Sequence, residues 1–431
     1  MTSGKSRNQR SSNKRTSRPR TASSEQAQVL AHGNTEVQPS NGLLEEQAVA
    51  EAPGSRVPLL VGGSLILGIL IVVFISLLLF APGVVSKFFP TIGASPTPVS
   101  VVTNDVARTD GRIMFIRRST DGKNRDIFVV NADGSDQEQV TSGIFIEGTA
   151  AWAPDGQHII AQVSMNSVST IARFAVGPDN RSTEQVLLTA DIKADSAFPA
   201  WSPDGKKVAF QSKRDGDLSQ VFVMDADGNN KARVSDGTGF DGQPAWSPDG
   251  KSIAYAGGAQ QVSGAEREIY VVPASGGTPV QITNAGSSLT TPVWSPNGNQ
   301  IMCLQIVGER DYKILIMNAD GSNLRTLFEG GAISGISFSP DGSSVLFYNI
   351  GDQGEAVHTV TVDDGTDTSI TAAGNGDYYP VWSPDGTQIA WASSADKQLH
   401  KIVAAKADGS GRRILSTGAG DDYGTSWALL K

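Results

Sequence analysis

The residues of this chain that could do chemistry are acidic side chains that recur at one position relative to a series of aromatic residues. Five positions before each aromatic, in chain order, stand Glu147, Ser196, Asp241, Leu289, Ile333, Asp377 and Asp422, and Asp195 precedes Ser196. Five of the seven repeats therefore place a carboxylate at or beside one equivalent point. A ring of carboxylates would focus a negative potential that can hold a cation or a basic peptide.

Aromatic side chains accompany these carboxylates and would supply contact area at the same place. We predict a ligand-binding mouth made of Glu147, Asp195, Asp241, Asp377, Asp422, Tyr378, Tyr379 and Tyr423, with Phe198 and Phe240 nearby. The gap at Leu289 and Ile333 suits an amphipathic peptide better than a bare ion, although a bound Ca²⁺ is a second expectation. The alternative stays open that each carboxylate only bonds the backbone amides of its own turn.

Other kinds of catalytic site find little support. No Gly-x-Ser-x-Gly motif of an α/β-hydrolase occurs, and His158, His358 and His400 fall at different points of their repeats without metal-ligand spacing. The Asp-x-Asp-Gly segments lack the closing Glu of a calcium loop and predict hairpin turns instead. The single Cys303 lies in an apolar run and is expected to be a small buried residue. We therefore expect no catalytic residue of these classes and no organic cofactor.

The elements that must position these residues form a repeat. The aromatics open pentapeptides of the type Trp-Ser-Pro-Asp-Gly at intervals of 49, 45, 48, 44, 44 and 45 residues, at Trp152, Trp201, Trp246, Trp294, Phe338, Trp382 and, without the pentapeptide, Trp427. Short β-branched and aromatic runs bounded by Asp-Gly turns predict antiparallel hairpins. A period in the forties built from such units is typical of a β-propeller, with one four-stranded blade in each repeat.

Proline and the chain ends suggest how the blades are arranged. Pro199, Pro244, Pro292 and Pro380 stand two positions before their aromatics. Because proline has no amide donor, this segment should be the innermost strand, which has one unpaired edge. Seven hairpin pairs begin near Arg112, Ile159, Val208, Ile253, Ile301, Val345 and Ile389. We predict an all-β, seven-bladed propeller at 109–431, with six or eight blades less favoured and the strand 423–430 completing the first blade.

The motifs Trp-Ser-Pro-Asp-Gly, Asp-Ala-Asp-Gly and a trailing Leu-Thr resemble those of the TolB-like β-propeller family with its WD-like repeats, over about residues 109–431. The resemblance implies a protein of the cell envelope that works through protein contacts, some of them at the propeller tunnel. TolB itself has six blades and a separate N-terminal domain, and neither is seen in this sequence. The motifs are specific for the fold and say little about the ligand.

The N-terminal quarter has a different composition. Residues 57–81 form an uncharged apolar stretch, and residues 58–81 alone reach about 36 Å as a helix, enough for a hydrocarbon core of roughly 30 Å. Seven basic residues and no acid in residues 1–20 predict that the N-terminus is cytoplasmic and the propeller extracytoplasmic. We expect a disordered basic tail at 1–56, a single-pass transmembrane signal-anchor helix at 57–81 and an extended linker at 82–108.

Charge narrows the choice of partner. Residues 1–56 carry eight basic and five acidic groups, and 57–102 carry Lys87 alone, so the total of −9 leaves −13 for residues 103–431. An acidic propeller argues against nucleic acid as a partner. The expected function is a membrane-anchored scaffold or sensor of the cell envelope that binds a protein or peptide. An enzyme that acts on envelope glycans through the carboxylates is the alternative.

Overall fold

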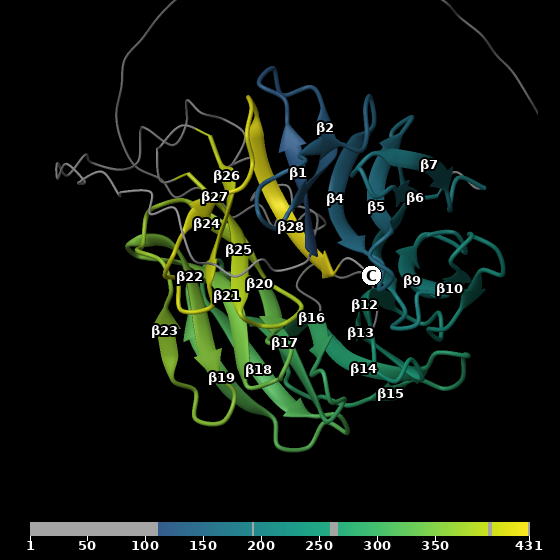
Figure 1. Ribbon diagram of the computed structural model, residues 1–431. Coiled ribbons are helices and arrows are strands. Elements are labelled where there is room, and N and C mark those ends of the chain that lie inside the picture. Colours follow the sequence, from purple (N-terminus) through teal and green to yellow (C-terminus); the bar gives the residue numbers. More distant parts are fainter. Residues whose placement is uncertain (1–110, 192–193, 259–265, 395–398, 430–431) are drawn as a thin grey trace, which may run out of the picture. The chain divides into compact units, whose positions relative to one another are not determined.

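The computed structural model describes residues 111–191, 194–258, 266–394 and 399–429 (Figure 1). The chain divides into two compact units, Met1–Val61 and Gly62–Lys431, and every described residue belongs to the second. The predicted tail, transmembrane helix and linker lie outside the described residues. Among the described residues there is no helix with the length and apolar character needed to cross a membrane.

Over the described ranges the chain is all β, with 28 strands in one eight-stranded and five four-stranded sheets. The eight-stranded sheet consists of two four-stranded units joined by one parallel pair, Arg125 with Phe145. The innermost strands are β28 (Asp421–Leu429), β4 (Phe145–Trp152), β8 (Ser196–Trp201), β12 (Phe240–Trp246), β16 (Ser288–Trp294), β20 (Ala332–Phe338) and β24 (Asp377–Trp382). The second strands are β1 (Gly111–Arg118), β5 (His158–Met165), β9 (Lys207–Ser212), β13 (Ser252–Gly258), β17 (Gln300–Ile306), β21 (Ser344–Gly351) and β25 (Gln388–Ser393).

The outer half of each four-stranded unit is shorter. The third strands are β2 (Arg125–Asn131), β6 (Val168–Val176), β10 (Gln220–Asp225), β14 (Glu268–Pro273), β18 (Tyr312–Asn318), β22 (Gly354–Thr361) and β26 (Lys401–Lys406). The outermost strands are β3 (Glu138–Gln139), β7 (Ser182–Leu187), β11 (Ala232–Arg233), β15 (Val280–Gln281), β19 (Arg325–Gly330), β23 (Asp367–Ser369) and β27 (Arg413–Ile414). Apart from β7 and β19, these outermost strands have only two or three residues and leave little edge for pairing with other chains.

The innermost strands contact one another in a closed circuit. β28 contacts β4, the contacts continue through β8, β12, β16 and β20 to β24, and β24 contacts β28 again. Pro199, Pro244, Pro292 and Pro380 lie on innermost strands that stand at the edge of their sheets, which confirms their predicted place. Repeated four-stranded sheets joined in this way are the architecture of a β-propeller.

The two ends of the described chain complete one unit together. The last strand, β28, pairs antiparallel with the first, β1, and Figure 1 shows them side by side. Ile113 lies opposite Trp427, and Arg118 lies opposite Asp421. The predicted closing strand is therefore confirmed, and it begins two residues earlier than expected. The pairing covers the edge that β1 would otherwise expose.

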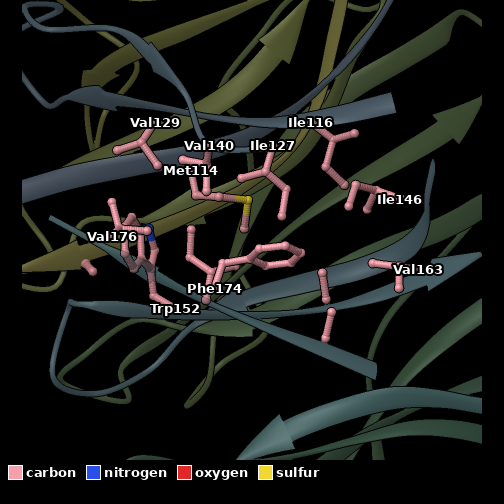
Figure 2. Close-up of a cluster of buried hydrophobic side chains, with 14 residues drawn as sticks. Met114, Ile116, Ile127, Val129, Val140, Ile146, Trp152, Val163, Phe174 and Val176 are labelled. Atoms are coloured by element: carbon pink, nitrogen blue, oxygen red, sulfur yellow. The ribbon is translucent and has the colours of Figure 1, made fainter. Parts of the chain in front are cut away.

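The core lies between neighbouring units. Ile113 and Phe115 of β1 pack with residues of β25 and β26, whereas Met114 and Ile116 face a cluster that includes Phe174 of β6. Figure 2 shows this second cluster, with Met114 close to Phe174 and Ile116 close to Ile146. Because successive side chains of a strand point to opposite faces, a strand between two units needs apolar residues on both. This requirement explains the continuous apolar runs in the sequence.

The Asp-Gly segments are turns, as predicted. In the turn after Trp201, the Ser202 hydroxyl donates to the Asp204 carboxylate over 2.7 Å, and the same oxygen accepts the Lys206 amide over 3.1 Å. Gly205 has a φ of +70°, in the left-handed region that glycine adopts easily. The carboxylate thus stabilises its own hairpin.

Candidate functional site

The residues five positions before the aromatics occupy equivalent points at the starts of the innermost strands. The amide of Asp241 donates to the carbonyl of Ser219 over 2.8 Å, and that of Asp422 donates to His400 over 3.1 Å. Leu289 makes the same bond to Arg267 over 2.9 Å. In each case the acceptor is the residue directly before the third strand of the preceding unit. The three residues that the sequence places at equivalent points of their repeats therefore make equivalent backbone bonds.

Asp422 is engaged in an ion pair inside the protein. Its side chain is 0% exposed, and the Arg117 guanidinium donates to both of its oxygens over 2.6 and 2.8 Å. The hydroxyl of Ser416 donates to the same carboxylate over 2.6 Å, and the Lys401 ammonium lies 3.7 Å away. A carboxylate with these partners links β28 to β1 and to β26.

Asp377 and Asp241 are also buried, but their surroundings differ. The Asp377 carboxylate accepts the indole N–H of Trp391 over 3.0 Å. Asp241 is 5% exposed, packs over Gly257 of the paired strand, and has one carboxylate oxygen without a hydrogen-bond partner. Burial raises the pKa of Asp241 to about 6, and the hydroxyl of Ser235 opposes only part of this effect.

Glu147 and Asp195 meet through one residue, Ser169 of β6. The Ser169 hydroxyl donates to the half-buried Glu147 carboxylate, which also accepts the amide of Gln162 over 3.2 Å. The backbone amide of Ser169 donates to the exposed Asp195 over 3.1 Å. These bonds, like those of Asp377 and Asp422, join different strands and are not the local turn bonds of the alternative interpretation. Whether any of the carboxylates binds a ligand stays a prediction.

The predicted tyrosines come together in a tyrosine cluster, made of Tyr348, Tyr378, Tyr379 and Tyr423. The ring centroids of Tyr348 lie 5.5 Å from those of both Tyr378 and Tyr379, and Tyr379 lies 6.5 Å from Tyr423. Tyr378, Tyr379 and Tyr423 are half-buried, whereas Tyr348 is fully buried beneath them. Burial raises the pKa of Tyr378 above its usual value, and the neighbouring Glu355 carboxylate adds to this. The cluster is therefore neutral, with polar hydroxyl groups on an apolar body.

A histidine completes the surroundings of the tyrosine cluster. The His400 ring lies edge-on to Tyr378 at 5.4 Å, and its Nδ1 contacts the Asp421 carboxylate at 2.8 Å. The Asp421 pKa is lowered in spite of burial, because His400 bonds to its carboxylate. Within the ranges that the structure covers, no three His, Cys, Asp or Glu side chains group as a metal site would require. The expected Ca²⁺ remains a prediction.

The sequence did not reveal a bulge at the same end of the innermost strands. Three positions before the aromatic, the backbone has a left-handed φ in six repeats: Phe198 at 50°, Gln243 at 55°, Thr291 at 53°, Gly335 at 66°, Tyr379 at 53° and Gly424 at 63°. The strand pairing shifts register at each of these points. Non-glycine residues in this conformation are uncommon and cost energy. Their side chains are uncharged, and they differ too much in type for sequence reasoning to group them.

Chemically, the starts of the innermost strands combine buried, bonded carboxylates with half-buried aromatic rings and uncharged bulge residues. This surface can contact apolar and aromatic groups and can form hydrogen bonds through tyrosine hydroxyls. It defines a β-propeller with an aromatic surface at one end of its innermost strands. A model of the TolB beta propeller domain family matches residues 103–363 and 291–428, so the chain belongs to this family.

Solved structures of several classes are similar to this chain. A puromycin-hydrolyzing peptidase of Mycobacterium tuberculosis has a TM-score of 0.55 at 14% identity, covering 75% of this chain and 55% of the peptidase. An oligogalacturonate lyase in complex with manganese has a TM-score of 0.52 at 11% identity, covering 71% and 85%. TolB from Acinetobacter baumannii has a TM-score of 0.49 at 19% identity, covering 75% and 68%. At such identities the likeness shows the fold alone.

A curated relative matches a short stretch. The uncharacterized peptidase YuxL of Bacillus subtilis (strain 168) is 42% identical over 41 residues, which are 10% of this chain and 6% of the relative. The stretch is about the length of one repeat. A match this short carries no argument about function.

Proposed function

We propose that this protein is a membrane-anchored scaffold or sensor of the cell envelope, whose propeller binds a protein or peptide at the starts of its innermost strands. The seven four-stranded units would be seven blades around a channel, and these strand starts would form its mouth. Residues 57–81 would anchor the protein in the membrane, with the N-terminus in the cytoplasm. The uncharged stretch and the basic residues before it support this topology.

The observation that carries the proposal is the tyrosine cluster. Three half-buried tyrosines contact one another on two neighbouring innermost strands, β24 and β28, and a fourth supports them from beneath. Tyrosine presents a large rigid surface at low entropic cost and is enriched where proteins bind one another. The hydroxyl of Thr425 donates to the carbonyl of Tyr379 over 2.6 Å, which holds the strained residue in place. The surface is thus ordered before a partner binds.

Binding is better supported than glycan chemistry. A glycosidase needs a pair of carboxyl groups that flank the bond to be broken. Asp422 and Asp377 are buried and bonded to Arg117 and Trp391, respectively. Asp241 has a raised pKa, but it is also buried. Asp241, Asp377 and Asp422 therefore act here as parts of the framework beneath the aromatic surface.

Photo-crosslinking in intact membranes tests the binding proposal. A photoreactive phenylalanine derivative would replace Phe198 or Tyr378, both half-buried aromatics of innermost strands. The matched control is the same replacement of Ile414, which is 63% exposed on the outermost strand β27. We expect a discrete protein adduct from the first two positions and none from the control. The same adducts from all three positions, or no adduct at all, would contradict binding at this surface.

The topology has a separate test. Cys303 is fully buried, so it gives no background with a thiol reagent that does not cross membranes. We expect such a reagent to label Ser410→Cys in intact cells and to label Ser23→Cys only after the cells are permeabilised. Labelling of Ser23→Cys in intact cells would contradict the proposed orientation.

A further inference from the structure

Arg267 is a half-buried arginine that contacts the starts of two innermost strands. It lies directly before β14, and its carbonyl accepts the amide of Leu289 at the start of the innermost strand β16. Its guanidinium lies over the ring of Phe240, at the start of β12, with 4.4 Å to the ring centroid. The arginine thus sits between the starts of two innermost strands. Stacking of this kind fixes the plane of the guanidinium and leaves its N–H groups at the edge.

No carboxylate neutralises this guanidinium among the residues that the structure describes. Arg117 pairs with Asp422, and Arg214 pairs with Asp191, whereas Arg267 has no ion pair. Burial lowers the pKa of Arg267, with no acidic group acting against the effect. Residues 259–265 contain no acidic residue, and Glu266 follows them directly.

The innermost strand that bonds to the Arg267 carbonyl supplies no acid at that point either. Where other repeats have Asp241 or Asp422 at the start of the innermost strand, the repeat beside Arg267 has Leu289. The neighbouring Glu268 is engaged elsewhere, because its carboxylate accepts the hydroxyl of Thr283 over 2.5 Å and the amide of Ala285 over 2.8 Å. A partly desolvated, stacked cation is therefore held in position without an anion.

We propose that Arg267, stacked on Phe240, recognises an acidic side chain of the peptide segment that binds at the starts of the innermost strands. The inference rests on the proposed function and adds the chemistry of the partner, an Asp or Glu carboxylate. Guanidinium and carboxylate match in a two-point bond, which is strongest where water is partly excluded.

The first test needs no knowledge of the partner. The full-length protein in detergent is treated with phenylglyoxal, which modifies arginine, in the presence of acetyl-Gly-Glu-Gly-amide or the matched glutamine peptide. Mass spectrometry follows Arg267 and, as an internal control, Arg181, which is 64% exposed on its side chain and paired with Glu138. We expect the glutamate peptide to slow modification of Arg267 and not of Arg181. Equal modification of Arg267 with both peptides would overturn the inference.

The second test uses the segment found by crosslinking. Replacing its acidic residue by the amide, or Arg267 by Gln, should each weaken binding about 10-fold or more, since bonds between charged groups contribute more than neutral ones. The two changes together should cost no more than either alone, because they remove the same bond. Arg181→Gln is the control and should bind normally. Unchanged affinity of Arg267→Gln would refute the role of Arg267, while a crosslinked partner would still support the proposed function.

Discussion

Asp241→Asn should make the protein more stable at neutral pH, because the wild-type carboxyl group is buried with one oxygen unbonded. Its pKa is about 6 in the folded protein, against the ordinary 3.8. A raised pKa means that folding favours the protonated form, so its stabilising contribution is complete below about pH 4 and is lost as pH rises through 6. The difference corresponds to a loss of about 3 kcal/mol at pH 7.5. The amide carries no charge and avoids this loss.

The size of the stability gain of Asp241→Asn depends on the group that replaces the unbonded oxygen. The variant places an amide N–H₂ there, which lacks a partner in the same way as the hydroxyl of the protonated acid. The two proteins should therefore be about equally stable at pH 4, and the variant should gain about 1–3 kcal/mol by pH 7.5. Urea unfolding followed by tryptophan fluorescence between pH 4 and 8 measures this difference, with the exposed Asp195→Asn as control. Parallel pH curves for Asp241→Asn and wild type would refute the reasoning.

Three further substitutions test the framework. Asp422→Asn leaves a buried guanidinium without its anion and should cost about 3–5 kcal/mol in urea unfolding; a cost below about 1 kcal/mol would mean that solvent reaches the pair. Gly156→Ala places a methyl group against the last carbonyl of β28 and should lower the melting temperature, whereas Gly143→Ala, also at positive φ, meets open space and should lower it much less. Trp246→Phe loses an indole bond of 3.1 Å to the neighbouring innermost strand, at about 1 kcal/mol, and should exceed Trp382→Phe, whose indole nitrogen has no partner.

Most of the fold could be predicted from the sequence because the residue pattern of each strand and turn recurs several times along the chain. The Asp-Gly turns, the prolines on the innermost strands and the closing strand at 421–429 all follow from local chemistry that the sequence displays. The register of the predicted carboxylates is also correct where the structure shows it, since Asp241 and Asp422 make the same backbone bond. These features depend on the residue type at each position of the repeat.

The face of the strand on which each carboxylate side chain lies could not be predicted, because of the bulge. Side chains of a regular strand alternate between its faces, so a residue five positions before the aromatic would lie on the opposite face. An extra residue at the bulge shifts this alternation. The bulge is occupied by residues as different as Thr291 and Tyr379, so no shared residue type in the sequence indicates its position. As a result, Asp377 and Asp422 bond to Trp391 and Arg117 inside the protein.

The positions that break the repeat are therefore more informative about function than those that keep it. Every unit needs its turns and its buried framework, but only one pair of innermost strands, β24 and β28, carries the tyrosine cluster. In the unit beside Leu289, Arg267 is stacked on Phe240 and has no ion pair with an acid among the described residues. Since β20 lies between the two places in the circuit of contacts, a ligand that used both would be extended and asymmetric. A peptide with apolar and acidic residues separated along its length meets this requirement, whereas a single ion does not.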